Sequence, residues 1–363
     1  MSMDVFFLVK QDFDKSLAEE FASQMLQFLN GGMLSLMISI GHKTGLFDLM
    51  SESEPSTSQE IAQKIKLNER YVREWLGAMV TGKIIKYDSS TEEYYLPREH
   101  SAFLTRKAGL NNLAVFAQYI SLMGDVEDKI VKCFRNGGGL PYSEYPEFQQ
   151  LNAEKSARVF DNRLIDKILK LNPEINGRLK DGIKVLDIGC GRGHAVNLMG
   201  KAFPRSIFTG CDISQEGITT AKEEANNMGL TNVRFEVKDA LLIEELGKFD
   251  LITAFDTIHD QAQPTRVLEA IHSSLKKGGF FLMQDIAASS KVDKNIDSPL
   301  APALYTISTM HCMSVSLAYN GEGLGTMWGK EMAIKKLTEA GFKGIKVKEV
   351  EGDIINYYYL SRK

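Results

Sequence analysis

The sequence predicts an α/β protein whose first half is mainly helical and whose second half holds a mostly parallel sheet. From Ile183 onward, short apolar segments typical of strands alternate with amphipathic helical segments, the pattern of a parallel sheet with helices on both faces. The last two strand segments, residues 344–350 and 355–363, have only a short connection between them. Because a parallel crossover needs a longer connection, we expect an antiparallel pair at the end of the chain.

Length, composition and charge narrow the class of protein. A chain of 363 residues with 44% hydrophobic residues can form about two domains. The net charge of -4 and the isoelectric point near 6.0 give no reason to expect nucleic acid or a membrane as partner. No apolar run reaches the ~18 residues of a membrane span, and a secretory leader is not expected. Four scattered cysteines and no carboxylates at metal-ligand spacing indicate a cytoplasmic enzyme without a metal.

The first half contains helices and one small mixed motif. Apolar residues recur at helical spacing in residues 16–30, 33–50, 111–135 and 144–171. Between the second and third of these, a short helix that we expect Ser58 to cap is followed by a helix ending near Gly82 and by two strands around a polar turn. This order predicts a winged helix. The polar, Pro- and Gly-containing residues 172–182 then indicate a linker, so we expect domains at 1–175 and 176–363.

The charge of the winged helix argues against binding to DNA. Residues 41–100 contain 8 Lys plus Arg and 10 Asp plus Glu, whereas a DNA-binding module presents a basic face to phosphates. The apolar helices at 25–29 and 33–50 instead favour an intertwined homodimer, with residues near Met25, Phe28 or Met33 reaching toward a substrate pocket. Packing of these helices within one chain remains the alternative.

The segment VLDIGCGRGH, residues 185–194, joins a strand to a helix through a glycine loop. Gly189, Gly191 and Gly193 allow positive φ angles and let a ligand approach bare backbone. Loops that bind dinucleotides usually space their last two glycines more widely. Asp212 ends the next strand, where a carboxylate can accept hydrogen bonds from ribose hydroxyls. Asp212 therefore indicates a ribose without choosing the cofactor.

These ordered motifs, with Asp239 ending the third strand and the terminal strand pair, resemble the class I S-adenosylmethionine-dependent methyltransferases. With the winged helix, the chain is similar to the small-molecule O-methyltransferases. The resemblance implies a Rossmann-like, seven-stranded sheet with an antiparallel last strand, and S-adenosylmethionine as cofactor. It implies these cofactor-binding residues: Asp187, Gly189, Gly191, Gly193, Asp212, Ile213, Asp239, Ala240 and Phe255. For Asp239, a plain turn role at the strand end remains open.

The resemblance also implies a general base. In the O-methyltransferases a histidine followed by an aspartate takes the proton of the acceptor, and His259 and Asp260 match this pair. Gln261 departs from the tryptophan that usually follows. An imidazole with an ordinary pKa of about 6.5 suits the role, although His259 could instead cap the strand or only orient the substrate.

We expect two regions of the sequence to bind the molecule that accepts the methyl group. Residues 303–328, rich in Met and aromatic residues, fall where the family inserts substrate-binding helices, and we expect Met310, His311 and Trp328 to contact substrate. Tyr142 and Tyr145 in GGGLPYSEYPEF add aromatic surface, which favours an aromatic or partly apolar small molecule. Methionines at helical spacing could equally belong to a core. Three alternatives stay open: a regulator with S-adenosylmethionine as effector, an N- or S-methyltransferase without a base, and a catalytically silent cofactor-binding partner protein.

Overall fold

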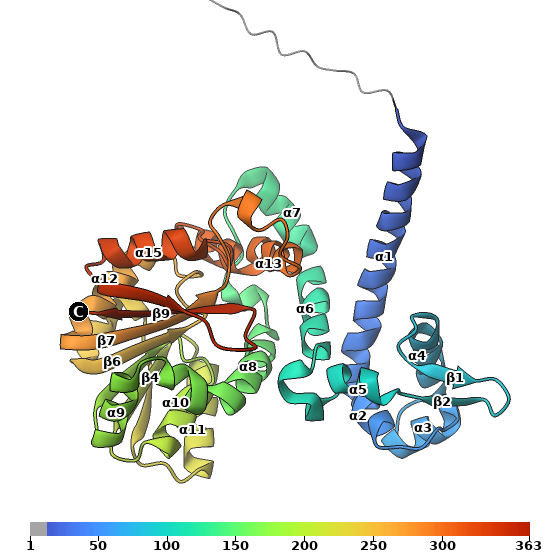
Figure 1. Cartoon of the computed structure of the whole chain (residues 1–363), viewed down its shortest axis with the longest axis horizontal. Coiled ribbons are helices and arrows are strands. Elements are labelled where there is room, and N and C mark those ends of the chain that lie inside the picture. The colour runs from blue at the N-terminus through green and yellow to red at the C-terminus, as the bar shows by residue number, and fades with distance from the viewer. Residues whose placement is uncertain (1–12) are drawn as a thin grey trace, which may run out of the picture. The chain divides into compact units, whose positions relative to one another are not determined.

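The computed structural model describes residues 13–363, and the chain divides into two compact units between Ile120 and Ser121 (Figure 1). This division does not coincide with the boundary expected near residue 175. It falls earlier because Phe160, Leu164 and Ile168 pack into the core around the large sheet and thereby attach the preceding helices to the second unit. Within the described residues, every helix is too short or too polar to cross a membrane.

The first unit has its own hydrophobic core. Its elements are α1 (Lys15–Thr44), α2 (Leu46–Ser51), α3 (Ser58–Ile65), α4 (Glu69–Thr81), β1 (Lys86–Asp88), β2 (Glu93–Tyr95), α5 (Arg98–Leu104), η1 (Arg106–Asn111) and the start of α6 (Ala114–Gly124). The helices α3 and α4 and the antiparallel pair of β1 and β2 confirm the predicted winged helix. Thr57, not Ser58, caps α3, because its side chain accepts the Glu60 N–H while the Glu60 carboxylate accepts the Thr57 N–H.

Helix α1 is continuous through Gly31 and Gly32, where two helices were expected. Neither glycine has another part of the chain within 4 Å of the place where a Cβ would stand. The helix ends only at Gly45, whose φ of 77° is left-handed. Glycine within a helix interior is unfavourable but tolerated, so its presence did not mark a break.

The second unit is built on a seven-stranded mixed sheet. Its strands are β3 (Lys184–Ile188), β4 (Ile207–Asp212), β5 (Val233–Val237), β6 (Phe249–Phe255), β7 (Leu275–Ile286), β8 (Lys343–Lys348) and β9 (Asn356–Arg362). The order across the sheet is β5-β4-β3-β6-β7-β9-β8, and β9 runs antiparallel to both of its neighbours. The predicted antiparallel end of a parallel sheet is therefore confirmed.

Helices cover both faces of this sheet (Figure 1). The helical elements of the second unit are α7 (Glu127–Asn136), η2 (Tyr142–Glu144), α8 (Phe148–Val159), the π-helical η3 (Phe160–Ile168), η4 (Leu169–Leu171), α9 (Pro173–Asp181), α10 (His194–Ala202), α11 (Gln215–Asn227), η5 (Ala240–Leu246), α12 (Pro264–Ser274), η6 (Val292–Lys294), α13 (Ala301–Ile307), the π-helical η7 (Ser308–Cys312), α14 (Met313–Ala318) and α15 (Gly329–Glu339). Alternate strand residues enter opposite cores: Val185 packs with α9, α10 and α11, and Leu186 packs with α12 and α15.

The segment expected to be a linker is helical. Pro173 occupies the start of α9, where proline is well tolerated because the first N–H groups of a helix have no partner within it, and Asn172 caps the helix. Ile175 and Leu179 are buried against the sheet. Composition alone suggested a linker because polar residues dominate the exposed face of this short helix.

The close packing around Gly41 in α1 generates a stability prediction. A Cβ on Gly41 would lie 2.6 Å from ring atoms of Phe47 and Trp75. We expect Gly41→Ala to lower the free energy of unfolding of the first unit by about 1–3 kcal/mol, the usual effect of overpacking a core. Urea denaturation followed by tryptophan fluorescence measures this change.

The matched control is Gly77→Ala on the exposed face of α4, where a Cβ would meet nothing within 4 Å. This change should raise the free energy of unfolding by roughly 0.5–1 kcal/mol through helix propensity. Equal stability of the two variants would contradict the packing described here.

Candidate functional site

A cavity of about 720 Å³ lies in the second unit, at the carboxyl ends of β3, β4 and β6. Ligands of open α/β sheets bind at this edge, outside the carboxyl ends of the strands. The floor of the cavity comes from the loops that follow these strands, and one wall comes from α8. A volume of this size is within the range of small-molecule and cofactor sites.

The glycine loop after β3 forms part of the cavity floor. Gly189, Gly191 and Gly193 have φ angles of 64°, 54° and 75°, which side chains rarely adopt. A Cβ on Gly191 would meet nothing within 4 Å, so this glycine presents bare backbone to open space. A Cβ on Gly193 would lie 2.4 Å from Ala221, so this glycine instead permits close packing of α10 on α11. Gly189 and Gly191 line the cavity, and Gly193 does not.

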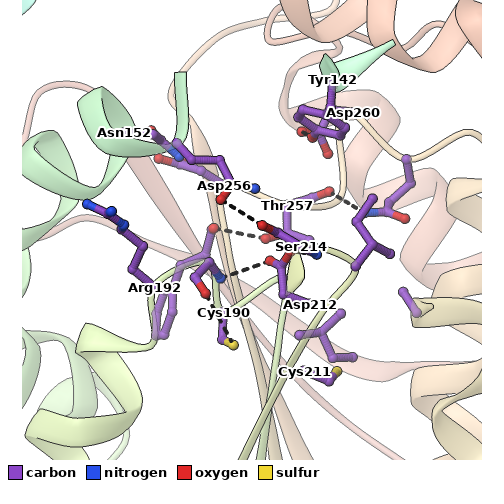
Figure 2. Close-up of a pocket in the computed structure, with 18 of the residues that line it drawn as sticks. Tyr142, Asn152, Cys190, Arg192, Cys211, Asp212, Ser214, Asp256, Thr257 and Asp260 are labelled. Carbon is purple, nitrogen blue, oxygen red and sulfur yellow. Dashed lines mark hydrogen bonds between the residues drawn. The ribbon is translucent and has the colours of Figure 1, made fainter. Parts of the chain in front are cut away.

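Asp212 joins two of the loops that line the cavity. Its carboxylate accepts the Gly191 N–H and the Ser214 N–H, each at 2.8 Å. Burial raises the pKa of Asp212, although these backbone donors oppose the rise. Figure 2 shows Asp212 and Ser214 facing the cavity, with Cys190 and Arg192 of the glycine loop beside them.

Two further carboxylates line the cavity near the carboxyl ends of β3 and β6. Asp187 accepts a hydrogen bond of 2.5 Å from the Thr253 hydroxyl, and burial raises its pKa to about 7. Asp256 follows β6 with a φ of 52°, rare for a non-glycine residue. Burial alone would raise the pKa of Asp256, but the ammonium of Lys155 at 3.0 Å lowers it overall. Backbone strain of this kind is concentrated at functional sites.

The other predicted cofactor residues also line the cavity. These are Ile213, Asp239, Ala240 and Phe255. Asp239 accepts the Leu241 N–H at 2.8 Å and so caps η5, which is the turn role that the sequence left open. Its position on the cavity wall is compatible with a second role, and the assignment to a cofactor stays a prediction.

His259 lies next to the cavity without lining it. Its side chain is 5% exposed, and its Nδ1 is 2.8 Å from a carboxylate oxygen of the fully buried Asp285 on β7. Burial would lower the pKa of His259, but Asp285 and the nearby Cys312 raise it well above its ordinary value. The role of His259 as a base stays a prediction.

Asp260 is the member of the predicted catalytic pair that faces the cavity. The Tyr142 hydroxyl donates a hydrogen bond to its carboxylate, and Figure 2 shows the two side chains together at one end of the cavity. Burial raises the pKa of Asp260 to about 6, against the opposing effects of His259 and Tyr142. Tyr145 also lines this end, with its hydroxyl 2.5 Å from the Met310 carbonyl.

The remaining predicted substrate residues do not line the cavity. Met310 and His311 lie behind the cavity wall, packed against side chains that form it. Trp328 is 4% exposed in the core between the sheet and the helices α12 and α15. Among residues 13–363, no three His, Cys, Asp or Glu side chains gather in a group that could hold a metal ion.

Several site residues were missed because their partners are distant in the sequence. Lys155 of α8 contacts Asp256, and Asp285 contacts His259. His194 also has distant partners, since its two nitrogens lie 2.6 Å from a Glu224 carboxylate oxygen and 2.8 Å from an Asp161 carboxylate oxygen. The Glu224 bond is the main reason that the pKa of His194 rises to about 9. Only the position of Asp256 directly after a strand could have drawn attention to it.

Each of the two units contains a match to a known domain family. Residues 32–106 match the Rv2258c-like winged HTH domain, and residues 179–340 match a methyltransferase domain. A ubiquinone biosynthesis O-methyltransferase of Leptothrix cholodnii is 26% identical over 113 residues, which are 31% of this chain and 47% of that protein. A fatty-acid O-methyltransferase of Mycolicibacterium smegmatis is 27% identical over 105 residues, 29% of this chain and 38% of that protein. The chain thus spans about half or less of the length of these curated relatives.

Solved structures share the fold over nearly the whole chain. An O-methyltransferase-like protein of Nostoc punctiforme superposes with a TM-score of 0.73 at 19% identity. The superposition covers 94% of this chain and 98% of that protein. Human N-acetylserotonin methyltransferase, solved in complex with S-adenosylmethionine, gives a TM-score of 0.69 at 20% identity and covers 97% and 99%. With the two domain matches and the mixed sheet, the chain combines an N-terminal winged HTH domain with a methyltransferase domain.

Proposed function

We propose that the protein transfers the methyl group of S-adenosylmethionine to an oxygen atom of a small molecule. The observation that carries this proposal is the charge of the cavity. Its lining contains six acidic residues and, apart from His194, two basic ones; the acidic residues are Asp187, Asp212, Glu216, Asp239, Asp256 and Asp260. S-adenosylmethionine carries a net positive charge, whereas dinucleotides carry an anionic pyrophosphate, so a carboxylate-rich cavity favours the former.

The residues present fit this cofactor. Asp212 offers a carboxylate to the ribose hydroxyls, and the open backbone at Gly191 admits a group in close contact. Asp187 and the glycine loop would hold the amino acid part, and Asp239 with Ala240 would face the adenine edge. When bound, S-adenosylmethionine supplies a methyl group that its sulfonium has already activated.

The protein must align the acceptor and remove its proton. We assign proton removal to His259, held by Asp285 at Nδ1, with Asp260 facing the acceptor. An imidazole that donates to a carboxylate through one nitrogen can accept a proton at the other in its neutral form, and Cys312 is a second hydrogen-bond partner of this ring. The names of the curated relatives support oxygen as the acceptor atom.

The acceptor end of the cavity is aromatic and apolar. It is lined by Tyr142, Tyr145, Phe148, Val315 and Tyr319. Such a lining favours an aromatic or partly apolar acceptor. The excess of acidic over basic residues in the winged helix supports a role other than nucleic-acid binding, and four free cysteines are consistent with a cytoplasmic location.

The partner of this chain is proposed to be a second copy. Helix α1 exposes apolar side chains along most of its length, including Leu17, Phe21, Met25 and Phe28, which follow one another at helical spacing. A long helix with an unpacked apolar stripe is unstable alone in water, and pairing of two such stripes would bury both. The approach of Met25, Phe28 or Met33 to a substrate pocket stays a prediction.

Cofactor binding tests the core of the proposal. Isothermal titration should show that S-adenosylmethionine or its demethylated product binds and that NAD does not. Asp212→Ala should weaken this binding by about 1.5–3 kcal/mol, because hydrogen bonds to a charged group are lost.

The control is Asp297→Ala, which removes an exposed carboxylate that does not line the cavity. It should leave the affinity unchanged. Preferential binding of NAD would overturn the proposed function, and an unchanged affinity of Asp212→Ala would remove Asp212 from the site.

The pH dependence of turnover tests the base. Only neutral imidazole accepts a proton, and Asp285 holds the pKa of His259 above its ordinary value, so turnover should rise with pH through a pKa above the usual histidine range. His259→Ala should lower turnover roughly 10²-fold and remove this rising limb of the pH profile. The affinity for S-adenosylmethionine should stay nearly intact.

Variants of Asp285 and Asp260 distinguish the roles of these two carboxylates from that of His259. Asp285→Asn should shift the limb to lower pH, because the carboxylate that raises the pKa of His259 is gone. Asp260→Asn should retain the limb of His259. A limb that survives in His259→Ala but disappears in Asp260→Asn would assign the base to Asp260 instead.

Sedimentation measures the proposed dimer. At micromolar concentration the wild type should sediment as a dimer, and the double variant Phe21→Glu with Phe28→Glu should sediment as a monomer, because charges would enter the apolar stripe. Ser23→Glu with Asn30→Glu places the same charge at the same spacing on the opposite side of the helix from this stripe and should remain dimeric. A monomeric wild type would contradict the dimer.

A further inference from the structure

His311 occupies an aromatic enclosure directly behind the acceptor end of the cavity. Its side chain is fully buried. Its ring stacks on Phe148, with ring centroids 3.5 Å apart and planes 14° apart, and meets Tyr145 and Tyr142 edge to face at 4.6 and 5.5 Å. These three residues line the cavity, so one layer of side chains separates the imidazole from it.

Neither ring nitrogen of His311 has a hydrogen-bond partner among the described residues. The hydroxyls of the two tyrosines around the ring are already engaged, since Tyr142 donates to Asp260 and Tyr145 donates to the Met310 carbonyl. Burial, with the charge of His259, lowers the pKa of His311 to about 3, so the ring is neutral near neutral pH. A neutral imidazole offers one donor and one acceptor. Leaving both unpaired in a buried position destabilises the folded state.

The local backbone is also unusual. His311 belongs to the π-helical segment η7, between α13 and α14. Short π-helical turns inside longer helices occur frequently at functional sites. Here the segment turns both His311 and Cys312 inward, and each is almost fully buried.

We propose that His311 is a specificity-determining residue that hydrogen-bonds a polar substituent, a hydroxyl or a carbonyl, on an aromatic acceptor. Both nitrogens hydrogen-bond in the plane of the imidazole, so the edge of the ring, and not the face that Phe148 covers, is the part that can pair with a substituent. An acceptor ring at this end of the cavity would bring its substituent to that edge by displacing the ring of Tyr142 or Tyr145. A buried group of this kind rejects an analogue that lacks the substituent, because the imidazole would then remain unpaired.

This inference rests on the proposed function and is tested on the full chain saturated with S-adenosylhomocysteine, so that no turnover occurs. The probes are phenol and toluene, which differ in a hydroxyl against a methyl group of similar size. Their dissociation constants are measured by ligand-observed NMR. Wild type should bind phenol at least severalfold more tightly than toluene. His311→Phe and His311→Leu, one larger and one smaller apolar residue, should bring the ratio close to one.

Phe148→Leu is the matched control, because it alters the apolar wall and leaves the imidazole in place. It should weaken both probes and preserve their ratio. Thermal unfolding gives a second readout: at least one apolar variant of His311 should be as stable as wild type or more stable, since an unpaired polar group has been removed. A purely structural histidine would instead lose stability in both.

The outcomes distinguish this inference from the proposed function. If S-adenosylhomocysteine fails to bind, the proposed function fails. If it binds while wild type shows no preference for phenol, or if both His311 variants retain the preference, the role of His311 is contradicted and the proposed function stands. Loss of stability in both His311 variants also contradicts the role of His311.

Discussion

The cofactor side of the site depends on the carboxylate of Asp212. Its two oxygens hold the backbone of the glycine loop and the backbone that begins α11, so two loops from neighbouring strands are fixed relative to each other. Ser214, positioned in this way, caps α11 through the Gly217 N–H and donates to Gln149 of α8. The floor of the cavity and the helix that walls it are thus tied through one residue. Any ribose that binds Asp212 adds to a network that the protein has already assembled.

The charged groups of the cavity lower the stability of the fold in exchange for a site that can bind a cation. The carboxylates of Asp187, which is buried, and of Asp212 and Asp260, which are partly buried, have raised pKa values because removal from water penalises their charged forms. Asp256 is the exception, since Lys155 compensates its charge. A core of apolar residues would be more stable than this arrangement. The sheet accommodates it at the edge where strands end, so the strained and charged groups are concentrated where a cationic ligand can neutralise them.

Much of this could be predicted from local sequence patterns. The alternation of strands and helices, the glycine loop and the antiparallel end of the sheet each depend on residues close together in the chain, and their spacing is visible in one sequence. The pairing of His259 with Asp285 and of Lys155 with Asp256 joins residues 26 and 101 positions apart, for which no local period exists. Residue type also cannot separate a core from a pocket: Trp328 was expected at the substrate and lies under the sheet. Asn172 to Gly182 looked like a linker because a short amphipathic helix and a polar loop have similar compositions.

The π-helical segment η7 determines which side of the following helix, α14, faces the cavity. A turn closed by bonds from residue i to i+5 holds one residue more than an α-helical turn, and one residue corresponds to about 100° of rotation. Val315 and Tyr319 face the cavity, and Ser314 accepts the Leu140 N–H, only with that extra residue in place. Gly139 lies so close to the Ser314 carbonyl that a Cβ there would be 1.8 Å away. Insertion or deletion of a single residue within η7 would therefore exchange the whole set of side chains that α14 presents to the acceptor, while the strands that carry the cofactor loops keep their register.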